Sequence, residues 1–260
     1  MRAWRFLAVL VLAVCAGCVK VDQDLIINED GTGSFDLAYS VSETTVQQVE
    51  AMRKLQKDLD EAAGRAAPAP RGTDFTRLLF NPILDEVRAK LKEYEKSGIS
   101  IEKLEVKSRD ARRNVEIKLQ FESLAKVADT DFFKQFGFSL TKEANGRYVI
   151  DRPPQVSELP GGIRFDDPQV VKILAPLLEG FSVTVGVRTP GKILSTSATI
   201  RGPFTAGWRY EFDRTPTALT DLLTQRFAVV FDGKGCNLPE LRAAATAAPG
   251  DGAGTAPAAK

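Results

Sequence analysis

The chain has 260 residues, of which 43% are hydrophobic, and a formal net charge of +1 at pH 7. This length is enough for one large domain or two small ones with a buried core. Nucleic-acid binders normally concentrate basic residues in a patch, because phosphate neutralisation supplies most of their affinity. The sequence has no such basic stripe, so we expect no nucleic-acid partner.

Residue types also restrict the chemistry. The chain contains no histidine and only three cysteines. Without histidine, the common Ser-His and Cys-His nucleophile arrangements cannot form, and the usual zinc sets lack ligands. No nucleophile elbow, P-loop or dinucleotide-binding signature occurs. We therefore expect a protein that is not an enzyme and holds neither metal nor cofactor, with a histidine-independent envelope hydrolase as the alternative.

Residues 1–17 have the pattern of a cleaved signal peptide. Arg2 and Arg5 form a basic start, an unbroken apolar run covers 6–14, and small residues follow. The run is shorter than the roughly 20 residues that cross a bilayer as a helix. Loss of this segment would leave a mature net charge of −1, since it carries two arginines and no acid.

Cys18 is the predicted lipid anchor. Ala16-Gly17 precede it, as in the signal of a bacterial lipoprotein, whereas cleavage before Cys15 would put the larger Val14 at the position that requires a small residue. We expect acyl chains such as palmitate on Cys18 to hold the protein to a membrane of the cell envelope. Because Val19 is not aspartate, the outer membrane is favoured over the inner one.

The periodicity of apolar residues predicts both strands and helices. Period-two alternation predicts strands at 19–27, 34–41, 104–106, 115–121, 181–187, 193–200, 208–212 and 227–231, with a hairpin at 138–150 around Asn145-Gly146. Stripes at three- and four-residue spacing predict helices at 42–59, 81–98, 123–136, 167–176 and 215–223.

The predicted fold class is α+β, an antiparallel β-sheet built of hairpins with amphipathic helices packed on it. Residues 18–235 would form this lipid-anchored domain, with a proline- and glycine-rich subdomain boundary near 152–165. Residues 62–73 are predicted to be a linker. The Ala/Pro/Gly composition of 236–260 predicts a disordered tail, because it cannot bury enough apolar surface to offset ordering.

An aromatic cluster is the main candidate for a ligand site. Its members could line a lipid-binding cavity between sheet and helices, or simply fill a core. The candidate lining residues are Phe132, Phe133, Phe136, Trp208, Tyr210 and Phe212.

Other polar and thiol groups have simpler interpretations. The turn at 28–33 resembles part of a calcium loop, but the EF-hand register would put Ile26 and Leu37 where carboxylates are needed. Asp22 and Asp24 share a strand face that is expected to meet water. Cys236 has no partner in the mature chain, so we expect an unpaired thiol or a bond to another chain.

Two stretches resemble the LppM-type bacterial lipoproteins. They are the strand after the lipobox cysteine with its Asn-x-Asp-Gly-x-Gly turn, and the later block from Phe181 through Pro190-Gly191 to Trp208-x-Tyr-x-Phe. The resemblance implies a soluble α+β domain on a lipid anchor, with lipid or glycolipid binding and no catalytic residues.

Together these observations predict a membrane-anchored, non-catalytic binding or envelope-associated module with a hydrophobic ligand such as a lipid. A structural subunit of an envelope complex is a further alternative. The sequence identifies no protein partner.

Overall fold

The computed structural model describes residues 19–44, 46–47, 51, 54, 84–130, 138–154, 158–159, 163–164, 180–212, 214–215 and 217–241. Several predictions fall outside this part of the chain. They are the signal peptide, Cys18, most of the 42–59 helix, the 62–73 linker, the 167–176 helix, the tail beyond 241 and three of the candidate cavity residues, Phe132, Phe133 and Phe136.

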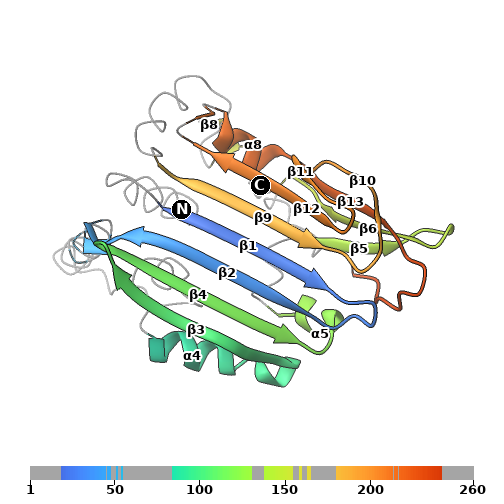
Figure 1. Ribbon diagram of the computed structural model, residues 1–260, viewed down its shortest axis with the longest axis horizontal. Coiled ribbons are helices and arrows are strands. Elements are labelled where there is room, and N and C mark those ends of the chain that lie inside the picture. Colours follow the sequence, from blue (N-terminus) through green and yellow to red (C-terminus); the bar gives the residue numbers. More distant parts are fainter. Residues whose placement is uncertain are drawn as a thin grey trace, which may run out of the picture.

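A seven-stranded sheet is the largest element (Figure 1). Its strand order is β11-β12-β9-β1-β2-β4-β3. The strands are β1 (Lys20–Ile27), β2 (Gly33–Ser42), β3 (Ile99–Arg109), β4 (Arg112–Phe121), β9 (Ser182–Arg188), β11 (Ile200–Arg201) and β12 (Thr205–Glu211). The β1–β2 and β3–β4 pairs are antiparallel hairpins, as the alternation predicts.

A four-stranded sheet has the order β10-β13-β6-β5. Its strands are β5 (Ser139–Lys142), β6 (Arg147–Arg152), β10 (Ile193–Thr196) and β13 (Phe227–Asp232), and a separate short pair joins β7 (Glu158–Leu159) to β8 (Ile163–Arg164). The predicted hairpin at Asn145-Gly146 is confirmed by the β5–β6 pairing. Gly146 takes a φ of 82°, which glycine adopts without steric cost.

The predicted α+β class is wrong. Of the residues that the structure describes, 51% are in strands and 17% in helices. Its α-helices among the described residues are short: α4 (Leu84–Lys92), α5 (Leu124–Ala128) and α8 (Ala218–Thr224), with a 3₁₀ turn η1 at Glu95–Ser97. The second sheet, rather than a layer of helices, covers part of the large sheet's apolar face. Alternation shows that a strand has an apolar face but not whether a helix or a sheet covers it.

The large sheet also differs from a simple series of hairpins. β1 pairs in parallel with β9, a strand from the far end of the chain, with Leu25 beside Val187. The hairpin β1–β2 is therefore joined on its other side to β9 and β12, which pair antiparallel. Parallel partners need a long connection, so neighbouring sequence carries no signal for this pairing.

One apolar core joins both sheets and α4. The inward residues of β1, β2 and β4 include Leu25, Phe35 and Leu119, which pack in the same cluster as Val229 of β13 and Val87 of α4. Burial of each such side chain contributes roughly 1.5–3 kcal/mol relative to exposure. The core therefore lies between the sheets and continues beneath α4.

The start of the predicted tail contacts this core. Leu238 and Leu241 are each 7% exposed, and Leu241 forms a bridge with Leu140 of β5. The backbone N–H of Asn237 donates to the carbonyl of Glu29 at 2.8 Å. Residues 236–241 thus contact the β1–β2 turn of the large sheet and β5 of the small sheet. Among the described residues, no helix is both long and apolar enough to span a bilayer.

Candidate functional site

The strand pair β6–β13 runs along the space between the two sheets, and its inward side chains differ from one end of the pair to the other. Tyr148 lies opposite Phe231, Ile150 opposite Val229, and Arg152 opposite Phe227. These positions face the same side because side chains alternate along a strand. One end of this ladder is closely packed and the other borders a cavity.

The packed end is centred on Tyr148. Its ring stacks on Phe231 with centroids 5.6 Å apart, and the two residues are 1% and 0% exposed. The Tyr148 hydroxyl donates to the carbonyl of Leu238 at 3.4 Å and accepts from the N–H of the same residue at 3.3 Å. The buried hydroxyl of Tyr148 is therefore satisfied both as a donor and as an acceptor.

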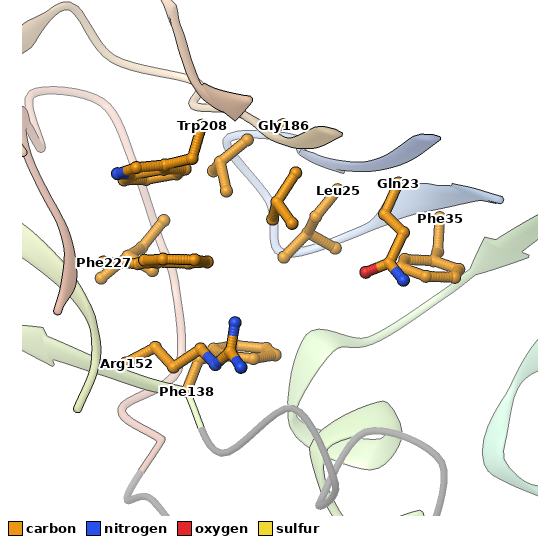
Figure 2. A pocket seen from close by; sticks show the side chains of 11 residues that line it. Gln23, Leu25, Phe35, Phe138, Arg152, Gly186, Trp208 and Phe227 are labelled. Carbon is orange, nitrogen blue, oxygen red and sulfur yellow. The ribbon is translucent and has the colours of Figure 1, made fainter. Parts of the chain in front are cut away.

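The hollow end is an apolar cavity between the two sheets (Figure 2). Its cavity volume is about 70 Å³, several times the roughly 10–15 Å³ that one water molecule needs and less than the roughly 300–1,000 Å³ of sites that enclose a whole small molecule. The lining residues come from β1, β2, β6, β9, β12 and β13 and from the residue before β5: Gln23, Leu25, Phe35, Phe138, Ile150, Arg152, Val185, Gly186, Val187, Trp208 and Phe227.

Three flat groups are layered at one side of the cavity (Figure 2). Trp208 stacks on Phe227 with centroids 4.7 Å apart and planes at 10°. On the other side of Phe227, the guanidinium carbon of Arg152 lies 4.7 Å from the ring centroid. Such a cation–π contact is worth about 0.5–2 kcal/mol, and it fixes the position of the Arg152 charge against the wall.

In the described part of the chain, buried polar atoms without hydrogen-bond partners occur at this end. Among the described residues, the buried side-chain nitrogens and oxygens without a hydrogen bond are Nε of Arg152 and Nε1 of Trp208. Burial lowers the pKa of the Arg152 guanidinium, and the Tyr210 hydroxyl offsets this in part. Arginine nevertheless stays protonated at neutral pH. The cavity therefore combines an apolar lining with one positive charge.

The structure separates the described members of the predicted aromatic cluster. Trp208 lines the cavity. The Tyr210 hydroxyl donates to Oε1 of Gln225 at 2.6 Å, and burial raises its pKa. Phe212 packs edge-on against Phe181, with centroids 4.8 Å apart. Neither Tyr210 nor Phe212 lines the cavity.

Sequence reasoning did not identify the two polar lining residues, although each left a signal. Gln23 occupies an inward position of β1, between Val21 and Leu25, where the alternation calls for an apolar residue. Arg152 similarly follows Tyr148 and Ile150 on the inward side of β6. A polar residue on the apolar face of a strand was the available sign of a site.

The acidic residues of the outer sheet face do not form a metal site. No group of three or more acidic or cysteine side chains in the described segments is arranged to hold a metal. Partial burial raises the pKa of Asp24, as do Asp36 and Asp22 to a smaller extent. Asp36 pairs with Lys118 at 3.3 Å, so this face has the ordinary ion pairs of a solvated sheet.

The turn after β1 uses its polar side chains locally. Oδ1 of Asp30 accepts from the backbone N–H of Thr32 at 3.0 Å and from its hydroxyl at 2.8 Å. These bonds lower the pKa of Asp30. Such Asx bonding is what aspartate supplies in a turn, so the turn itself accounts for Asp30.

Cys236 is partly buried and free among the described residues. Burial raises the pKa of its thiol, and Glu29 and Asp232 raise it further. Because the thiolate is the reactive form, these neighbours make Cys236 a poor nucleophile.

The comparisons with known proteins do not assign a function. No protein-family profile and no curated protein matches the chain. Among solved structures, the chain is similar to the folded domain of the LppM protein of Mycobacterium tuberculosis, determined by NMR. The TM-score is 0.38 and the identity 11%, over 85% of this chain and 95% of that one. The score is too low for the likeness to carry an argument about the site.

Proposed function

We propose that this protein is a lipid-anchored, non-catalytic binding module of the cell envelope, whose inter-sheet cavity holds the acyl chain of a hydrophobic ligand. The cavity itself is the observation that supports this most: the core packs closely at Tyr148 and Phe231 but is open at Trp208 and Phe227. Protein interiors normally have few voids larger than a water molecule. A space of this size with apolar walls favours a ligand.

The lining suits a hydrocarbon chain. Leu25, Phe35 and Val187 supply aliphatic and aromatic surface from three neighbouring strands of the large sheet. Each methylene transferred from water contributes about 0.8 kcal/mol, so burial of about eight would offset a large part of the cost of association.

Ligand binding is tested with the mature chain carrying Cys18→Ser, which removes its own acyl chains and the need for detergent. A fluorescent fatty acid should bind at one site per chain. Val187→Phe, which fills the cavity from β9, should abolish binding. The matched control, Val230→Phe, makes the same change at a position of β13 that does not line the cavity and should bind normally. Equal binding by both variants would contradict the proposed site.

The anchor has its own test. Cys18→Ser in the full-length chain should abolish incorporation of labelled fatty acid and release the protein from membranes, because stable attachment needs two or three acyl chains. Unchanged labelling would refute the anchor at Cys18 and leave the cavity unaffected.

A further inference from the structure

We infer that the ligand of the cavity carries an anionic headgroup, a carboxylate or a phosphate, and that Arg152 binds it. This inference rests on the proposed function, because it assigns the chemical class of the ligand in that same cavity. It is carried by the position of Arg152 and by the polar atoms that lack partners around it.

Among the described residues, no acidic side chain forms an ion pair with Arg152. Its neighbour Asp151 points to the other face of β6, where it pairs with Arg226 at 2.5 Å. No described carboxylate forms an ion pair with Arg152, whose surroundings are the ring of Phe227 and the cavity. The arginine on the outer side is thus neutralised, while the one on the cavity side is not.

An unpaired, partly buried cation is unfavourable for folding. Removing a charged group from water costs free energy that an opposite charge or full hydrogen bonding must offset. An apolar side chain opposite Phe227 would continue the pattern set by Tyr148 and Ile150 on the same strand. The cation–π contact with Phe227 offsets only part of this cost, and an anion supplied by a ligand would offset the rest.

The unsatisfied atoms are both donors. Nε of Arg152 and Nε1 of Trp208 each need an acceptor, and both residues line the cavity. In Figure 2 the Trp208 nitrogen lies at the end of its ring away from Leu25, so we assign the headgroup to Arg152 alone. A guanidinium presents parallel N–H groups that match a carboxylate or phosphate.

The geometry also orients the ligand. With its anionic group at Arg152, the hydrocarbon chain would lie against Leu25 and Phe35, which are farther along the cavity in Figure 2. Gln23, beside Phe35, offers both a donor and an acceptor. The ligand class is thus a single-chain amphiphile with an acidic end.

The test compares four probes of one chain length: tetradecanoate, tetradecyl phosphate, methyl tetradecanoate and tetradecylamine. Each is titrated by calorimetry into the Cys18→Ser mature chain with Arg152, Arg152→Met or Arg152→Lys. Arg147→Met is the matched control, since Arg147 is exposed at the opposite end of β6 and does not line the cavity. Circular dichroism checks that every variant is folded.

We expect one or both anions to bind Arg152 protein about 10- to 100-fold more tightly than the ester, the gain of a charge-assisted hydrogen bond, and the amine to bind most weakly. A preference for only one anion identifies the headgroup. Arg152→Met should bind the ester normally and lose the preference, Arg152→Lys should keep part of it, and Arg147→Met should keep all of it.

Equal affinity for anions and ester would overturn the headgroup inference while leaving the hydrophobic site in place. A preference that survives Arg152→Met would also overturn it. If none of the probes binds, the proposed function itself fails, and the headgroup inference fails with it.

Discussion

The two ends of the β6–β13 ladder show how one strand pair serves both stability and a candidate site. At one end, Tyr148 and Phe231 stack and the Tyr148 hydroxyl has two hydrogen bonds. At the other, Phe227 stacks on Trp208, yet Nε of Arg152 and Nε1 of Trp208 have no partner. The strands, the pairing and the alternation are the same, so the difference is in the side chains alone.

Unsatisfied polar atoms and empty space occur together at the hollow end. A buried polar atom without a partner costs about 1–3 kcal/mol, and a cavity adds the loss of packing contacts. Both costs occur at the hollow end and neither at the packed end. Selection for stability alone would remove them, which favours a functional reason for the hollow end.

Truncation of the stacked rings should give the largest difference between the two ends in the free energy of unfolding. Phe231→Ala removes a fully buried ring from the packed end and should lower the free energy of unfolding by about 3–5 kcal/mol. Phe227→Ala should cost less, because its ring already borders empty space. Urea denaturation measures both, and equal losses would contradict the contrast.

Enlargement of a valine tests the empty space directly. Val229→Phe, at a position that is 0% exposed, should overpack the core and cost about 1–3 kcal/mol. The same change at Val187, which lines the cavity, should alter the free energy of unfolding by less than about 1 kcal/mol. A Val187→Phe protein as unstable as Val229→Phe would mean that the cavity is not available space.

Removal of a polar group should have opposite consequences at the two ends. Tyr148→Phe deprives the N–H and carbonyl of Leu238 of their partner and should cost about 1–2 kcal/mol. Arg152→Met replaces an unpaired cation by an apolar chain, so the free energy of unfolding should not fall. Thermal unfolding of both variants checks this, and a large loss for Arg152→Met would indicate a structural role instead.

The outer face should show the smallest effect. The pKa of Asp24 is raised by partial burial and by the charges of Asp36 and Asp22. The Asp24 carboxyl therefore holds its proton more tightly in the folded chain than in the unfolded chain. Stability therefore falls as pH rises through the window between the ordinary and the raised pKa. Asp24→Asn should be more stable at neutral pH by less than about 1 kcal/mol, since water screens the site. The gap to the wild type should close near about pH 3, and a gap that widens on acidification would refute this.

Local pattern was enough to predict much of the strand structure. Alternation and the Asn145-Gly146 turn correctly predicted β1–β2, β5–β6 and the strands at Phe181, Trp208 and Phe227. Turn residues and period-two patterns act within a few residues, so a single sequence carries them.

The arrangement of these strands was not predictable in the same way. The parallel β1–β9 pairing joins residues near 20 to residues near 182, and nothing local encodes it. The covering of the large sheet by β6 and β13, which makes the α+β prediction wrong, likewise depends on long-range packing. The cavity results from that packing. Its only signal in the local sequence is the presence of polar residues on the apolar faces of two strands.

Ligand binding at the hollow end is tested most directly by a methyl NMR titration of the Cys18→Ser mature chain with tetradecanoate. We predict shifts at the methyl groups of Leu25, Ile150 and Val187, which line the cavity, and none at Leu140 and Val229, which belong to the packed core. An absence of shifts at saturating ligand, or equal shifts at both sets of methyl groups, would contradict the assignment of the hollow end as the binding site.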